Sequence, residues 1–348
     1  MEYSEDSKSG NEYRKEYLSS INRLICERRR VLLDHRMALS KDIIEKCDEY
    51  RNILIDMLGW PLTDKVHAPL SVREKFIAEE NGVRIFRVQF EIFKDFYWYG
   101  VLLKNKNDKL PLVIAQHGGL GTPELCSGLL SGGTANYNDM VEKILNRGVH
   151  VFAPQMLLWD KDTYGIKYDR LKIDAELKQV GGSISAIEIY CLRCCMSYFE
   201  SREYVNKDKI GMVGMSYGGF YSLYTAAIDT RIKTVLSSSF FNDRYIYSWI
   251  DWTWFKSGEI FGDSDVALLI YPRKLWITVG TEDNVFDINS ARNELKRLKK
   301  ECETNMIGAE WVNYFESDAV HEFCADDAVI DDFIAELVSN MGEGEKQV

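Results

Sequence analysis

The spacing of apolar residues changes along the chain, and each spacing predicts a different kind of structure. Over residues 11–58 apolar side chains recur at steps of three and four, which predicts helix, with Ser40 as an N-cap and Gly59 at the end. Over residues 83–93 and 96–103 apolar and polar residues alternate. That alternation predicts two antiparallel strands that lead into a larger sheet.

Further along the chain, short apolar runs alternate with helical segments. The expected strands begin at residue 112 and then cover 149–154, 210–215, 234–239, 275–280 and 311–315. The expected helices cover 185–199, 217–228, 288–300 and 328–338, and a capping box of Ser185 and Glu188 would open the first of them. This order predicts an α/β protein with a mostly parallel central sheet and helices on both faces.

The same pattern divides the chain into three parts. Residues 1–70 are an N-terminal helical extension, of which the first ten residues are predicted to be disordered. Residues 71–340 form the α/β domain, with insertions near 156–182 and 240–267, and residues 341–348 are a polar tail. Because open α/β sheets bind ligands at the carboxyl ends of their strands, we expect both insertions to border the site.

Charge and composition limit the classes of partner. The 46% of apolar and 28% of charged residues are typical of a globular protein. A net charge of −11 would repel nucleic acid and an anionic membrane, so neither is an expected partner. The chain has no basic start followed by an apolar core and no run of about eighteen apolar residues, which predicts a cytoplasmic protein.

No cofactor and no metal are expected. Cys191, Cys194 and Cys195 crowd one helical segment without a fourth ligand nearby, so we interpret them as buried thiols rather than a metal cluster. The expected partners are a small-molecule ester and, through the exposed helical extension, another copy of the chain.

One segment carries chemistry, namely Gly214-Met215-Ser216-Tyr217-Gly218-Gly219. It follows a strand-like run and precedes a helical one, so Ser216 would lie on a tight turn that exposes its hydroxyl as a nucleophile. Side chains at the flanking glycines would collide with the neighbouring strand and helix. A Gly-x-Ser-x-Gly match alone is common by chance, so the surrounding sequence has to indicate whether Ser216 is catalytic.

That context is the order of the remaining residues. Of five histidines only His321 lies after Ser216, and a nucleophile on such a turn takes its partners in the order Ser, acid, His. His321 is therefore the candidate base. Asp283, which closes an apolar strand in Gly-Thr-Glu-Asp, is the favoured acid, with Asp287 and Asp243 as alternatives.

From about residue 72 to about residue 338 the chain resembles the α/β-hydrolase superfamily, in particular its dienelactone hydrolase and acetyl xylan esterase-like group. The resemblance is carried by Ile270-Tyr271-Pro272-Arg273-Lys274-Leu275 leading into Gly280-Thr281-Glu282-Asp283, and by Ala319-Val320-His321-Glu322-Phe323. Val320 departs from the glycine that many relatives carry before the histidine. Ser216-Tyr217-Gly218-Gly219 is also similar to the prolyl oligopeptidase catalytic domain.

The expected mechanism is acyl transfer through Ser216. His321 would take the hydroxyl proton as the oxygen attacks an ester carbonyl and would return it to the leaving alcohol, while Asp283 orients the imidazole. The backbone amides of Tyr217 and Gly119 would form the oxyanion hole. His117, in the same loop as Gly119, would brace that loop through hydrogen bonds.

Three functions follow. The resemblance implies a serine esterase that acts on a small acyl ester, with acetylated carbohydrate as one candidate. A serine peptidase related to prolyl oligopeptidase is the alternative, although only about seventy residues precede the hydrolase domain. A noncatalytic binding member of the fold is the third. The candidates for a pocket that favours short acyl chains are Trp159, Trp249, Trp252 and Trp254, with core packing as their alternative role.

Overall fold

The computed structural model describes residues 3–106 and 109–339, so the polar tail predicted over 341–348 lies outside the described residues. Within the described ranges nine strands form one sheet in the order β1-β2-β3-β5-β4-β6-β7-β8-β9. β1 to β3 and the β3–β5 pair are antiparallel, and the strands from β5 across to β9 are parallel. The predicted mostly parallel sheet is confirmed.

The strand bounds agree with the sequence pattern except at the start of the sheet and at β6, which begins five residues before the expected 210–215. They are β1 (Ser71–Glu80), β2 (Val83–Phe93), β3 (Phe96–Lys104), β4 (Leu110–Gln116), β5 (His150–Pro154), β6 (Val205–Met215), β7 (Ile232–Ser238), β8 (Lys274–Gly280) and β9 (Val312–Ser317). β1 was not expected. It is an edge strand and nearly all of its residues are exposed, so its sequence carries no alternation of apolar and polar residues.

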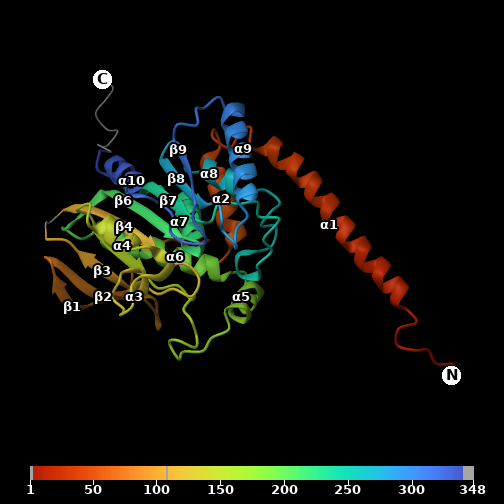
Figure 1. Ribbon diagram of the computed structural model, residues 1–348, viewed down its shortest axis with the longest axis horizontal. Helices are drawn as coiled ribbons and strands as arrows, with labels where there is room; N and C mark the ends of the chain where they lie inside the picture. Colours follow the sequence, from red (N-terminus) through yellow and green to blue (C-terminus); the bar gives the residue numbers. More distant parts are fainter. Residues whose placement is uncertain (1–2, 107–108, 340–348) are drawn as a thin grey trace.

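The helices cover both faces of the sheet, as predicted (Figure 1). They are α1 (Asn11–Leu39), α2 (Cys47–Leu58), α3 (Pro123–Cys126), α4 (Met140–Leu145), α5 (Arg170–Gln179), α6 (Ile184–Glu200), α7 (Tyr217–Ile228), α8 (Asp263–Leu268), α9 (Ile288–Thr304) and α10 (Asp327–Ser339). Leu112 and Ile114 of β4 join the core under α6 and α7, whereas Val113 and Ala115 join the core under α4 and α10. Successive residues of one strand therefore supply two cores.

The N-terminal extension is helical, as expected, and contains the two helices α1 and α2. Ser40 does not begin a helix: it follows α1, and its amide donates to the carbonyl of Arg36 as a C-cap. α2 ends at Gly59, whose φ of 88° favours a residue without a side chain. Figure 1 shows α1 extending away from the sheet and the helices around it.

The capping box predicted for α6 is also wrong. The residue that caps α6 is Ser183, whose hydroxyl accepts a hydrogen bond from the Ala186 amide at 3.0 Å. The Ser185 hydroxyl donates instead to the carbonyl of Asp251, and the Glu188 carboxylate pairs with a guanidinium from another segment. Tertiary partners decided between two serines that are equally good caps by sequence.

The last turn of α1 is fixed to the rest of the protein by the buried Arg36. Its guanidinium lies 2.9 Å from Asp265 and 3.8 Å from Glu294. Two more buried carboxyl groups belong to the same region: Asp263 beside Asp265 in α8, and Glu301, two turns after Glu294 in α9. Burial raises the pKa of Glu301 to about 9 and that of Asp263 to about 7.

These raised pKa values predict a stability that falls with rising pH. A carboxyl group whose pKa is higher in the folded protein stabilises the fold fully below its unfolded pKa, and that contribution is lost as the pH rises through the folded value. We therefore expect the contribution of these two carboxyl groups to the free energy of unfolding to fall between about pH 5 and pH 9, which lowers the melting temperature over that range. In Glu301→Gln the fall should be smaller, whereas Glu303→Gln, an exposed control on the same helix, should follow the parent. Equal slopes in the two variants, measured by calorimetry, would contradict the assignment.

Candidate active site

Ser216 lies on a strained turn between β6 and α7. Its φ and ψ are 60° and −121°, and its side chain is nearly buried. A Cβ at Gly214 would lie 2.2 Å from the carbonyl oxygen of Gly218, and a Cβ at Gly218 would lie 2.2 Å from that of Gln116. Both positions therefore require glycine, because the chain passes too close to itself for a side chain.

A chain of hydrogen bonds leads from this serine to a buried carboxylate. His321 Nε2 lies 2.9 Å from the Ser216 hydroxyl, and His321 Nδ1 lies 2.8 Å from Asp283 Oδ2. The other carboxylate oxygen of Asp283 accepts from the amides of Val285 and Phe286 at 2.7 and 3.0 Å. The three side chains follow β6, β8 and β9, so the carboxyl ends of parallel strands bring them together.

The alternative acids have other contacts. Asp287 is the N-cap of α9, where its carboxylate accepts from the Asn289 amide at 2.8 Å. The Asp243 carboxylate accepts from the Tyr245 amide at 2.9 Å. Within the described part of the chain, Asp283 alone of the three bonds His321.

The two amides expected to bind an oxyanion lie next to each other. Tyr217 is the first residue of α7, so its amide has no helical carbonyl four residues earlier. The Gly118 amide donates to the Tyr137 hydroxyl at 3.0 Å, whereas no acceptor among the described residues is found for the Gly119 amide. A Cβ at Gly119 would be 3.8 Å from the Tyr217 ring, which places Gly119 against the nucleophile turn.

His117 holds this loop in place as a neutral, buried side chain. Its Nε2 accepts from the Met156 amide at 3.0 Å, and its Nδ1 donates to the carbonyl of Gly118 at 2.9 Å. Burial lowers the pKa of His117 to about 4, in keeping with an acceptor role for Nε2. His117 thereby ties the Gly118-Gly119 backbone to the start of the first insertion.

The tryptophans of the second insertion differ in burial: two lie in the hydrophobic core and one is partly exposed. Trp252 is fully buried, and Trp254 is nearly so, against Phe220. Neither offers a free face to a ligand, because the Arg244 guanidinium also lies over the Trp252 ring at 4.5 Å. For these two residues the structure favours core packing over the expected pocket wall. Trp249 stacks on Trp252 at 4.5 Å and is 36% exposed.

Trp249 belongs to an aromatic group beside the histidine. Its ring centroid lies 5.8 Å from that of Tyr217 and 5.7 Å from that of Phe286. The Phe286 ring lies 5.5 Å from His321. This group restricts the space on one side of the Ser216 hydroxyl.

The structure reveals a buried ionic network that the sequence did not indicate. Arg170 of α5 contacts Asp251 at 2.6 Å and Glu188 of α6 at 3.1 Å, and the Tyr217 hydroxyl donates to Asp251 at 2.9 Å. Asp251 comes from the second insertion and Arg170 from the first. The network therefore fixes both insertions to α7, the helix that follows Ser216. Its members are far apart in the sequence, and no local pattern marks them as partners.

Two neighbouring cavities share part of their lining and involve the first insertion. The smaller, of about 270 Å³, is lined by Tyr99, Thr122, Glu124, Leu130, Gln155, Trp159, Tyr164 and Ile166. The larger, of about 570 Å³, shares Tyr99, Gln155 and Trp159 with it and is otherwise mainly apolar. A β-bridge joins Trp159 to Leu120, so this tryptophan is attached to the loop that carries Gly119.

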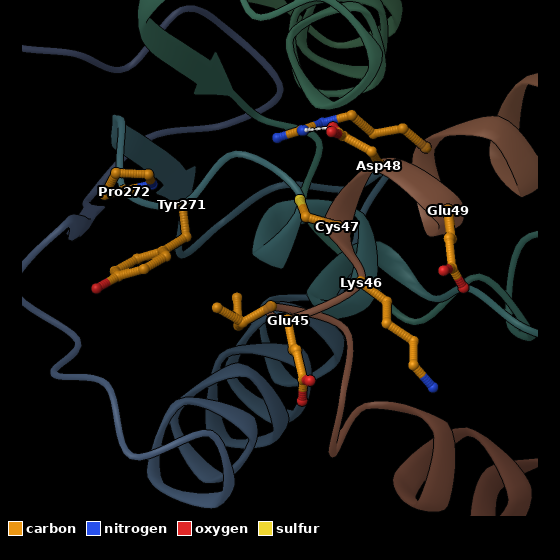
Figure 2. Close-up of a pocket in the computed structure, with 9 residues that line it drawn as sticks. Glu45, Lys46, Cys47, Asp48, Glu49, Tyr271 and Pro272 are labelled. Carbon is orange, nitrogen blue, oxygen red and sulfur yellow. Dashed lines mark hydrogen bonds and ion pairs between the residues drawn. The ribbon is translucent and has the colours of Figure 1, made fainter.

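A third hollow, of about 570 Å³, lies at the opposite edge of the sheet. Figure 2 shows Tyr271 and Pro272 on one side of it and the first turn of α2, with Cys47, on the other. Pro272 precedes β8, so this hollow is at the amino ends of the strands, away from Ser216.

The described residues contain no group of three or more His, Cys, Asp or Glu side chains arranged to hold a metal ion. Among the helices described, none combines the length and the apolar character needed to span a bilayer.

Comparisons with known proteins agree with this architecture. The model of the dienelactone hydrolase family matches residues 104–336. The chain is 28% identical over 260 residues to YtaP of Bacillus subtilis, and the match covers 68% of this chain and 81% of that protein. YtaP is itself assigned as a hydrolase only by inference.

Solved structures give the same fold at low identity. A Bacteroides fragilis protein, assigned as an acetyl xylan esterase by inference, is 14% identical with a TM-score of 0.63, covering 85% of this chain and 83% of that one. A glucuronoyl esterase from Solibacter usitatus is 12% identical with a TM-score of 0.61, covering 87% and 94%. The resemblance found in the sequence is confirmed.

Proposed function

Because the chain belongs to the dienelactone hydrolase family, we propose that it is a serine esterase in which Ser216, His321 and Asp283 form the catalytic triad. The observation that carries this proposal is the continuous hydrogen-bonded path from the Ser216 hydroxyl through both ring nitrogens of His321 to Asp283. A nucleophile bonded to a base, and a base bonded to an orienting acid, is the arrangement that acyl transfer requires.

In the proposed reaction His321 Nε2 takes the proton of Ser216 as the oxygen attacks the ester carbonyl. The amides of Tyr217 and Gly119 then donate to the negatively charged oxygen, and each such donor contributes about 3 kcal/mol to the transition state. His321 returns the proton to the leaving alcohol, and water repeats the sequence on the acyl-enzyme. Asp283 keeps the Nδ1 proton in place and stabilises the imidazolium.

The surroundings of Ser216 support a small acyl group. Trp249 and Phe286 lie beside the triad, and the buried network around Arg170 prevents the second insertion from moving away easily. The cavity lined by Trp159, whose backbone pairs with Leu120 next to Gly119, supports a hydroxyl-rich alcohol, because it combines the Trp159 ring with polar side chains such as Thr122. An acetylated carbohydrate fits both descriptions and is the substrate class we propose.

Two tryptophan variants test these two subsites separately. Trp249→Ala should reduce the preference for acetyl over octanoyl nitrophenyl esters by roughly 10-fold, because it widens the acyl side. Trp159→Ala should raise KM for an acetylated xylo-oligosaccharide by roughly 10-fold, while kcat/KM for nitrophenyl acetate stays close to that of the parent.

Each variant is the control for the other. If Trp249→Ala left the acyl-chain preference unchanged and Trp159→Ala left KM for the oligosaccharide unchanged, neither insertion would contact the substrate. Hydrolysis of an aminoacyl nitroanilide in preference to every ester would favour the peptidase alternative. Failure of a fluorophosphonate to label Ser216 would favour a noncatalytic member of the fold.

A further inference from the structure

The N-terminal two thirds of α1 lie outside the folded body of the protein (Figure 1). Residues 11–28 are exposed, apart from the half-buried Ser20. Contacts with the body begin at Arg28, which lies 3.7 Å from Glu259, and at Arg29, whose guanidinium lies over the Tyr245 ring. About 30 Å of helix, at 1.5 Å per residue, therefore projects from the body.

This projecting part carries an apolar face. The large apolar side chains that form it are between 36% and 75% exposed, and they are Tyr13, Tyr17, Leu18, Ile21, Leu24 and Ile25. Their spacing in steps of three and four places them on one side of the helix. The remaining positions are mostly charged or small, so the apolar face is a stripe with Ile21 near its centre.

A helix of this kind is not expected to stay solvated. Helices in proteins are stabilised mainly by packing of their apolar faces rather than by helix propensity alone. A contiguous exposed apolar surface that runs along one side of a helix marks an interaction site. The apolar face of α1 therefore needs a packing partner, and the body of its own chain does not provide one.

The charge distribution indicates which kind of partner would bind this apolar face. α1 carries seven Lys or Arg and four Asp or Glu residues, a net charge of +3, in a chain whose net charge is −11. Although α1 itself is positive, the rest of the chain carries a net charge of −14 (−11 less +3), so an anionic membrane would repel the body to which α1 is attached. A second copy presents an identical apolar stripe, and two such stripes are self-complementary about a two-fold axis.

The orientation of that pair follows from the arginines. In a parallel pair Arg28, Arg29 and Arg30 of one copy would lie beside the same three residues of the other, where like charges repel. An antiparallel pair centred on Ile21 places Glu12 beside Arg30 of the partner subunit and Glu27 beside Lys15 of the partner subunit, whereas Arg14 beside Arg28 of the partner subunit is a like-charged contact. Opposite charges therefore outnumber like charges, and the two bodies lie at opposite ends of the pair. We propose that the protein is a dimer in which the apolar faces of two α1 helices pack antiparallel around Ile21.

The test compares two double variants of the full chain that add the same charge. Ile21→Glu with Leu24→Glu disrupts the stripe, and Ser19→Glu with Cys26→Glu changes exposed residues on the opposite side of α1. Light scattering after gel filtration should give twice 40.2 kDa for the parent and for the opposite-face variant, and 40.2 kDa for the stripe variant. The melting temperature of the body should be unchanged in both, since the substituted side chains are exposed.

Other outcomes overturn the proposal. A parent chain of monomer mass at all concentrations, or a stripe variant that stays dimeric, would exclude this interface. A monomeric parent that sediments with phosphatidylglycerol vesicles, when the stripe variant does not, would assign the face to a membrane surface instead. The measurement of mass does not depend on catalysis, so it stands whatever reaction Ser216 performs.

Discussion

Replacing Ser216 with alanine is expected to lower kcat/KM for nitrophenyl acetate by roughly 10⁴-fold or more. His321→Ala should have an effect of the same size, and the double variant should be hardly slower than either single variant. The reason is that proton removal and nucleophilic attack are one event, so the loss of either partner removes the whole pathway. Steady-state kinetics with the best ester substrate measures all three.

Stability provides the control for this result. Ser216 and His321 follow the carboxyl ends of β6 and β9 and are not part of the apolar packing between sheet and helices, so the melting temperatures of the variants should stay within a few degrees of the parent. A Ser216→Ala variant that kept a tenth of the parent rate would contradict the mechanism. So would a double variant that was much slower than both single variants.

The second large effect is expected at the acid. Asp283→Asn should lower kcat by roughly 10⁴-fold, because an amide NH₂ facing Nδ1 reverses the imidazole tautomer and leaves Nε2 unable to accept the serine proton. KM should change much less, since Asp283 is buried behind His321 and does not reach the substrate.

Two aspartates in the same region are the matched controls. Asp287→Asn and Asp243→Asn remove carboxylates that accept hydrogen bonds from backbone amides without touching His321. We expect their kcat values to stay within about threefold of the parent, in line with the loss of a local turn or cap contact. A larger loss in either variant than in Asp283→Asn would move the acid to that position.

Much of the site could be predicted because its chemistry depends on residue order. One strand-to-helix turn with glycines that tolerate close backbone approach, one histidine downstream and one acid at a strand end left few combinations. The hydrogen bonds at Ser216, His321 and Asp283 join the side chains that this order selected. Parallel strands with their carboxyl ends at one edge bring such residues together without further information.

The sequence by itself determined most of the strand and helix order, the turn at Ser216 and the candidate base, since each rests on local spacing or on a short list of residues. Only the tertiary structure decided which serine caps α6, that β1 forms an exposed edge strand, and that Trp252 is buried while Trp249 is not. It also decided that Arg170, Glu188 and Asp251 meet beneath Tyr217. Such outcomes depend on contacts between segments far apart in the chain, where the burial of apolar side chains and the pairing of buried polar groups override local preference.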